Sequence, residues 1–447
     1  MNKLNIILIH AHDLGRHLGC YGEQSVDTPN LNSFAASGVR FSNSFCTSPS
    51  CSPSRGSLFT GRYPHVCGVM GLTQSPFDWD LYPGEKHIAG ILKDNGYNTA
   101  SVGIIHESSR SPEKLGYKYF NQTHDAVEIS DTAVQLMKKF KKDKEAPFFL
   151  NIGFLEPHRL PSDTVGRENL MIDEDHDFLG EHLSSELDSN IDIPGYLKDT
   201  PGTRREISEL NAALNFIDSQ FKKVIDCLEE EKLKENTLVI FTSDHGIALP
   251  GAKCSLYDPG ISIPIILSLP SREGWFGGIK IDHMVSSMDI LPSILKLLNI
   301  ENDNPMNGLS FTGLLDGEDY NRRTELFTQM TYHDYYDPRR SIRTDKYKLI
   351  LNFSSAPSIM DPSQSWRPRS EMLRPNPKAH YHKHVELYDL EKDPWEMTDI
   401  AESEDYKIIL KTLLMKLLNL MKETSDPLLD GAVLSPHHKK TMGYLDE

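Results

Sequence analysis

Three apolar runs of this chain are each followed directly by ionisable or imidazole side chains. The runs cover residues 5–9, 147–154 and 237–241, and each has the length and composition of a strand buried on both faces. The residues that follow them are His12 and Asp13, Glu156 and His158, and Asp244 and His245. Buried parallel strands alternating with helical segments predict an α/β fold. In such folds the carboxyl ends of the strands build the ligand site.

The pattern of elements divides the chain into two parts. Residues 1–320 are predicted to form an α/β domain in which helices cover a large, mixed and mostly parallel sheet. Within it, residues 160–203 carry few periodic apolar side chains and are expected to form a long loop region over the site. Residues 321–447 hold short strands separated by turns and then a helix at 406–422. This second pattern predicts a smaller α+β subdomain with an antiparallel sheet.

Charge and hydropathy exclude several classes of function. The net charge of −17 argues against nucleic acid or an anionic membrane as the main partner. No stretch approaches the ~20 apolar residues of a membrane span. The chain starts with a core strand rather than a secretory leader, and its six cysteines show no paired framework. We therefore expect a cytoplasmic protein in a reducing compartment.

One stretch near the start, residues 50–61, has the sequence Ser-Cys-Ser-Pro-Ser-Arg-Gly-Ser-Leu-Phe-Thr-Gly. Ser52 is expected to cap a short helix that Pro53 begins and Gly61 closes. The free N–H groups of that helix would face Cys51 and favour a bound anion, with Arg55 one turn along. The alternative is a buried structural cysteine, which is common in proteins. The combination of cap, proline, arginine and closing glycine favours the reactive site.

This stretch resembles the signature of the sulfatase family. The resemblance implies an alkaline-phosphatase-like sandwich fold and a hydrolase whose Cys51 is oxidised to formylglycine by a formylglycine-generating enzyme. The aldehyde hydrate is then the nucleophile that attacks sulfur. The segments 156–159, 244–260 and 335–343 are similar to the heparan N-sulfatase branch of that family. They imply a sulfated sugar or glycosaminoglycan fragment as substrate, and most specifically N-sulfoglucosamine. The resemblance is also compatible with a homo-oligomer.

The resemblance also implies a divalent metal site. Asp13, Asp244, His245 and the modified Cys51 fall on family ligand positions, whereas His12 stands where the family has a second aspartate. Calcium prefers hard oxygen ligands, while imidazole suits transition metals. We expect calcium, with manganese as the alternative if His12 is a ligand.

Four further residues match catalytic positions of the family. Arg55 and the metal are expected to activate the nucleophile, and Lys253 to hold a sulfate oxygen. His158 is the better candidate for protonating the leaving group, and His106 for deprotonating the intermediate. The family lysine two residues before that histidine is replaced by Ile104.

Two other functions remain open at this stage, a phosphate or phosphonate monoester hydrolase of the same superfamily and a non-catalytic binding protein. The intact nucleophile motif argues against the second. Sugar recognition is assigned to a basic cluster formed by Arg339, Arg340 and Arg343, for which surface ion pairs are the alternative.

Overall fold

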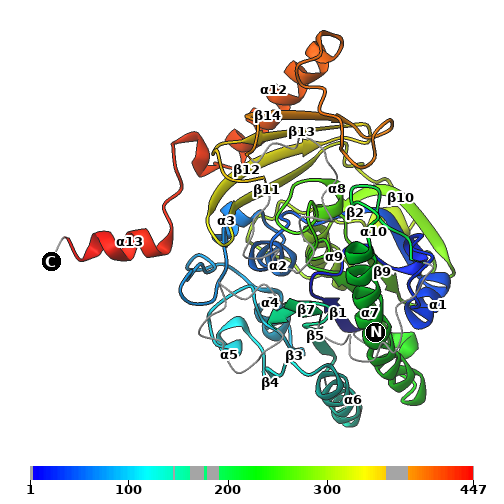
Figure 1. Cartoon of the computed structure of the whole chain (residues 1–447). Coiled ribbons are helices and arrows are strands. Elements are labelled where there is room, and N and C mark those ends of the chain that lie inside the picture. The colour runs from blue at the N-terminus through cyan, green and yellow to red at the C-terminus, as the bar shows by residue number, and fades with distance from the viewer. Residues whose placement is uncertain (1–3, 144–145, 162–175, 179–190, 359–380, 446–447) are drawn as a thin grey trace.

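The computed structural model describes residues 4–143, 146–161, 176–178, 191–358 and 381–445. An eight-stranded sheet runs through its centre in the order β10-β2-β9-β8-β1-β5-β3-β4 (Figure 1). Neighbouring strands are parallel, except that β9 runs antiparallel to β2 and β8. The bounds of the strands are β1 (Asn5–Ala11), β2 (Val39–Phe45), β3 (Asn98–Gly103), β4 (Tyr119–Asn121), β5 (Phe148–Gly153), β8 (Thr237–Ser243), β9 (Ile265–Ser268) and β10 (Ile279–Ser286).

Helices bury both faces of this sheet, which explains the unbroken apolar character of its central strands. In β1, Ile6 and Leu8 pack into the core on one face, whereas Ile7 and Ile9 pack into the core on the other. The first core is closed by α2 (Cys51–Thr60), α4 (Ile88–Asp94) and α9 (Ile290–Leu298). The second is closed by α1 (Pro29–Ser37), α6 (Ala126–Lys142) and α7 (Pro201–Glu230).

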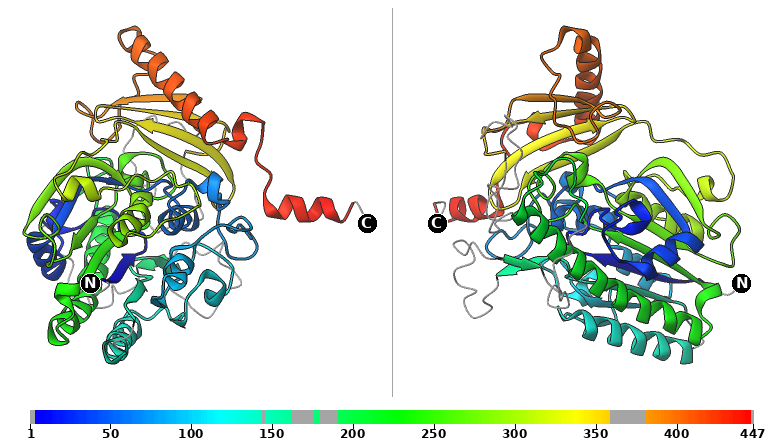
Figure 2. Two further views of the ribbon diagram at one scale, coloured as in Figure 1. Left: turned by 180° about the vertical axis from the view of Figure 1, so that it is seen from behind. Right: turned by 45° about the vertical axis from the view of Figure 1, so that its right-hand side comes forward.

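A second sheet lies at the C-terminal end of the chain and is antiparallel throughout, in the order β11-β12-β13-β14. Its strands are β11 (Leu326–Tyr332), β12 (Tyr336–Arg343), β13 (Tyr347–Asn352) and β14 (Val385–Asp389). The helix α12 (Lys407–Glu423) packs on it through Leu413, Leu417 and Met421. Figure 2 shows the last helix, α13 (Pro436–Gly443), extending away from the body of the molecule.

Short elements complete the described chain. They are α3 (Pro64–Cys67), α5 (Pro112–Leu115), α8 (Asp258–Ile261), α10 (Thr312–Leu315) and the paired strands β6 (Arg159–Pro161) and β7 (His176–Phe178). The loop region predicted over residues 160–203 falls partly outside the described residues, and its described part holds β6, β7 and the first turn of α7.

The predicted fold class is confirmed, with a large mixed sheet between helices and a separate antiparallel sheet. No helix among the described residues is long and apolar enough to cross a membrane. All six cysteines are described and none forms a disulfide.

Candidate active site

Four neighbouring strands deliver the candidate side chains to one edge of the large sheet. β8, β1, β5 and β3 lie side by side and run parallel, so their carboxyl ends meet at the same edge. The side chains that follow these strands are Asp244 and His245, His12 and Asp13, His158, and His106. Residues more than 200 positions apart in the chain thereby come within hydrogen-bonding distance.

Cys51 is the first residue of α2 and is buried at this edge. The prediction that Ser52 caps the helix is wrong, because Ser50 occupies the N-cap position and α2 begins one residue before Ser52. The Ser52 hydroxyl is used elsewhere, since it accepts a hydrogen bond from the Thr73 N–H at 3.2 Å. Gly61 closes the helix in the left-handed conformation (φ 69°), as predicted.

Asp13 lies at the centre of the site and is fully buried. One carboxylate oxygen accepts from Lys253 Nζ at 2.7 Å and lies 2.6 Å from His158 Nδ1. The other lies 2.8 Å from His12 Nδ1 and 3.1 Å from His245 Nε2. Burial alone would raise the pKa of Asp13, but the positive charges of Lys253 and the histidines hold it well below its usual value. This carboxyl group is therefore ionised.

Asp244 is the second buried carboxylate. Its Oδ2 accepts from Arg55 Nε at 3.1 Å and lies 3.0 Å from Arg55 Nη2 as an ion pair, and its Oδ1 accepts from the backbone N–H of Asp13 at 2.9 Å. Burial opposes ionisation, but His12, His245 and Arg55 lower the pKa of Asp244 below its ordinary value. Two anionic side chains thus face the same small volume.

The Cys51 sulfur lies 3.2 Å from His245 Nε2. Burial would raise the pKa of this thiol, yet Lys253, His12 and His245 lower it well below its ordinary value. Position 51 therefore has the electropositive surroundings that stabilise an anionic nucleophile.

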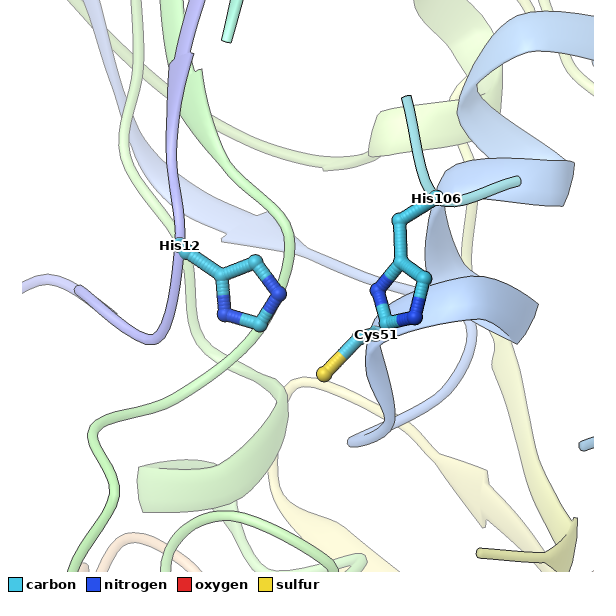
Figure 3. Close-up of side chains that lie close together, drawn as sticks. All are labelled: His12, Cys51 and His106. Carbon is cyan, nitrogen blue, oxygen red and sulfur yellow. The ribbon is translucent and has the colours of Figure 1, made fainter. Parts of the chain in front are cut away.

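His12 and His106 lie on opposite sides of the Cys51 sulfur (Figure 3). Ligand atoms of His12, Asp13, Cys51 and Asp244 all lie within 4.8 Å of one another, as do those of His12, Cys51 and His106. Burial would lower the pKa of His12, but Asp244, Cys51 and Asp13 raise it to about 9. Two carboxylates with adjacent imidazole form a donor set that fits a divalent cation.

The two histidines proposed as acid and base are held differently. His106 Nε2 lies 2.7 Å from Gln74 Oε1, so Nδ1 is the ring atom left toward Cys51. His158 is held by Asp13, and burial lowers its pKa to about 4 although the Asp13 carboxylate opposes this shift.

Sequence reasoning missed the support beneath Arg55. His10 Nδ1 accepts from Arg55 Nη1 at 2.8 Å, and His10 Nε2 donates to Asn151 Oδ1 at 3.0 Å. Burial, followed by the charge of Arg55, lowers the pKa of His10 to about 3, so the ring is neutral and can accept. The sequence signal that could have revealed this support is the presence of two polar side chains, His10 and Asn151, within otherwise apolar strands.

The three arginines assigned to sugar recognition do not lie at the surface. Arg340 is fully buried against Asp426, Arg339 lies 2.9 Å from Asp337, and Arg343 lies 2.9 Å from Asp258. All three guanidinium groups are thus buried and held by carboxylates of the chain. Arg159 is likewise buried in an ion pair with Glu206.

Comparison with known proteins decides the family. A family model described as sulfatase matches residues 4–300, and one described as N-sulphoglucosamine sulphohydrolase, C-terminal, matches residues 252–361. The chain belongs to the sulfatase family. Human N-sulphoglucosamine sulphohydrolase is 25% identical over an alignment that covers 95% of this chain and 91% of the relative.

Solved sulfatases share the fold. The structure of the sulfatase yidJ from Bacteroides fragilis has a TM-score of 0.73 at 22% identity, covering 97% of this chain and 98% of that one. A second structure, BT4656 in complex with its substrate D-glucosamine-2-N,6-O-disulfate, has a TM-score of 0.69 at 17% identity, covering 95% and 98%. Membership of the family shows that the chain is a sulfatase and therefore a hydrolase. It favours this activity over phosphate-ester hydrolysis and over a non-catalytic binding function.

Proposed function

We propose that this sulfatase removes the sulfo group from a sulfated hexosamine, as a sulfate ester or a sulfamate, taken from a glycosaminoglycan-type fragment. The observation that carries the proposal is the buried constellation of Cys51, Arg55, Lys253 and two carboxylates at one sheet edge. The relative that acts on N-sulphoglucosamine and the neighbour that binds a disulfated glucosamine support the choice of sugar.

Position 51 is proposed to act as formylglycine, produced by a formylglycine-generating enzyme that is a transient partner of the chain. The hydrated aldehyde supplies a hydroxyl nucleophile for attack on sulfur. Arg55 lies one turn along α2 and is fixed by Asp244 and His10, so it orients that position without movement. Lys253, buried beside Asp13, is placed to neutralise charge on a non-bridging sulfate oxygen.

The two histidines have complementary proposed roles. His158 lies against Asp13, where its side chain keeps 24% exposure, and is proposed to protonate the leaving amine or alcohol. An anionic sulfo group bound beside the ring would raise its pKa from the value of about 4 in the free site, as this role requires. His106, with Nδ1 toward position 51, is proposed to take the proton that releases sulfate and restores the aldehyde.

The donor set fits a divalent cation held by Asp13, Asp244, His12, His245 and position 51. Such an ion would polarise the sulfate oxygens and lower the pKa of the nucleophile. Calcium is the ion we propose, and manganese is the alternative favoured by ligation through His12. Metal analysis of the purified protein and of His12→Ala distinguishes them. Calcium bound through oxygens should survive this change, whereas an ion ligated by the imidazole should be lost.

The substrate is tested by measuring sulfate release from glucosamine N-sulfate, glucosamine 6-sulfate and an aryl sulfate, with an aryl phosphate assayed in parallel. The Cys51→Ala variant is the matched control for background hydrolysis. We expect release from at least one sulfated glucosamine at a higher kcat/KM than from the aryl sulfate. A preparation that carries formylglycine but hydrolyses only the aryl ester would contradict the proposed sugar class.

A further inference from the structure

A second cavity, of about 560 Å³, lies beside strands β2 and β10. Its lining contains none of the residues proposed above for catalysis or metal binding. The loop after β1, the turn around Tyr196 and the Pro394–Trp395 corner of the C-terminal subdomain form its walls. The volume falls in the range of small-ligand sites and far exceeds what a single inorganic ion requires.

Three cations line this cavity. Arg40 on β2 stands directly opposite Lys280 on β10 in the strand register, an arrangement that places like charges side by side. Arg16, from the loop after β1, is the third. Its guanidinium donates to Ser42 O and to Ser262 Oγ, which fixes it against the sheet. Both arginines also lie over the Tyr21 ring, at 5.1 Å for Arg40 and 6.0 Å for Arg16.

Two carboxylates, Glu23 and Asp258, also line the cavity, and among the described residues neither is ion-paired with Arg16 or Arg40. Asp258 lies 2.9 Å from Arg343 and 2.6 Å from Lys348, so it already serves two cations. Among the described residues neither Arg16 nor Arg40 forms an ion pair. Burial lowers the pKa of Arg16, the charge of Asp258 opposes this shift most strongly, and Arg343 and Arg40 lower the pKa by smaller amounts. An anion in the cavity would offset the repulsion between Arg40 and Lys280 and add to the attraction that Asp258 provides at Arg16.

Aromatic faces accompany the cations. Tyr196 and Trp395 pack against each other with ring centroids 5.6 Å apart, and Trp395 remains 39% exposed at the cavity. A planar ring with one free face packs well on the apolar face of a sugar ring, because both surfaces are flat and weakly hydrated. Guanidinium groups with flanking aromatic rings therefore match a ligand that is both anionic and saccharide.

We propose that this cavity is a second binding site, which holds an acidic saccharide through Arg16 and Arg40 and packs it against Trp395. The ligand chemistry is a sugar ring that carries a sulfate or a carboxylate. The inference rests on the proposed function, since it assigns the site to the same class of sulfated glycan. Arg16 follows Asp13 by three residues, so their Cα atoms are at most about 11 Å apart. A glycan held here is thus close to the catalytic edge.

The test is calorimetric titration of the full chain carrying Cys51→Ala, which prevents turnover, at low and high salt. The probes are a trisulfated heparin disaccharide, an unsulfated hyaluronan disaccharide, sodium sulfate and neutral chitobiose. Arg40→Ala and Trp395→Ala are compared with Arg322→Ala, which removes an exposed arginine elsewhere on the surface. Thermal unfolding of each variant verifies that it is folded.

We expect Arg40→Ala to weaken one binding event for an acidic disaccharide by about tenfold or more, because charge-assisted hydrogen bonds are lost. Arg322→Ala should leave the affinity for the acidic disaccharide unchanged, and neutral chitobiose should not bind. The heparin and hyaluronan arms show whether sulfate or carboxylate is the group held. Binding of sodium sulfate as tight as that of the disaccharides, or affinities unchanged by both Arg40→Ala and Trp395→Ala, would overturn the proposal.

A failure of the proposed function has a different signature. In that case protein that carries formylglycine at position 51 hydrolyses no sulfated glucosamine, while the binding event that depends on Arg40 persists. In the converse case, turnover of glucosamine sulfate is normal and unaffected by Arg40→Ala, but no saccharide binding depends on Arg40. The proposed function and the proposed second binding site can therefore be refuted independently of each other.

Discussion

Replacing Arg340 by methionine should destabilise the protein and leave sugar binding unchanged. The guanidinium is fully buried, pairs with Asp426 and lies 2.9 Å (Nη2) from its Oδ1. It also donates to the Met330 carbonyl at 2.8 Å, so each side of the group is occupied by protein. The pair joins β12 to the segment after α12. We expect this pair to hold the antiparallel sheet and that segment together rather than to contact substrate.

The magnitude follows from the charge left behind. Removing one partner of a buried ion pair costs about 3–5 kcal/mol, because the remaining charge has neither water nor a counterion. Unfolding of 447 residues carries an entropy of about 0.9 kcal/mol/K, from about 2.1 cal/mol/K per residue. The melting temperature of Arg340→Met should therefore fall by about 3–5 °C if the chain unfolds in one transition. The double variant with Asp426→Leu should recover most of this loss.

The pH dependence gives a second check on the same pair. Burial would raise the pKa of Asp426, but the hydrogen bond and charge of Arg340 hold it below its usual value. The pair thus stabilises the native state at neutral pH, and this contribution is lost as the pH falls through the folded-state pKa. In Arg340→Met the buried carboxylate protonates more easily. The gap in melting temperature between variant and parent should narrow from about pH 7 to about pH 4.

Differential scanning fluorimetry measures the melting temperatures, and sulfate release measures kcat and KM on the folded variants. Unchanged stability combined with a raised KM for a sulfated glucosamine, and an unchanged KM for an aryl sulfate, would refute this reasoning and restore Arg340 as a sugar contact.

Three further changes probe the site. Asp244→Ala should remove bound metal and activity together, and unchanged metal content by elemental analysis would refute its role as a ligand. Lys253→Met should lower kcat/KM for sulfate esters by about 10²–10³, as expected for loss of one electrostatic contact, with kinetics on the metal-loaded protein as the measurement. His10→Leu leaves a buried Arg55 donor without its acceptor and should cost about 1–3 kcal/mol in stability and lower kcat at unchanged metal content. Wild-type kcat in this variant would show that His10 does not position Arg55.

The central strands and the residues after them could be predicted because their information is local. Unbroken apolar runs such as 237–241 indicate burial on both faces, and a parallel sheet then brings Asp13 and Asp244 to one edge. The strand β10 could not be predicted, because it lacks such a local apolar signal. Its first half alternates apolar and charged residues at the sheet margin and so lacks the run that marks a central strand.

Long-range pairing was the information that sequence could not supply. The partner of Arg340 lies 86 residues further along the chain, and the partner of Arg343 lies 85 residues before it. Nothing local distinguishes a buried, paired arginine from one that faces a ligand. The same limit applies to Gln74, whose contact with His106 spans 32 residues that include α4 and β3.

Three expectations from the sequence remain proposals. A boundary between residues 320 and 321 is to be tested by limited proteolysis followed by mass analysis of the fragments. Cytoplasmic localisation and a homo-oligomeric state likewise stay predictions, which fractionation of cells and light scattering would address.

The most direct test of the proposed nucleophile is the mass of the tryptic peptide from Phe41 to Arg55. The chain is produced with a formylglycine-generating enzyme, and the peptide is analysed before and after treatment with a carbonyl reagent, alongside the rate of sulfate release. We predict the mass of a residue in which one oxygen has replaced the sulfur and two hydrogens of Cys51. We also predict a further mass gain with the reagent and activity in proportion to the modified fraction. Full hydrolysis of a sulfated sugar by protein whose Cys51 remains an unmodified thiol would contradict the account.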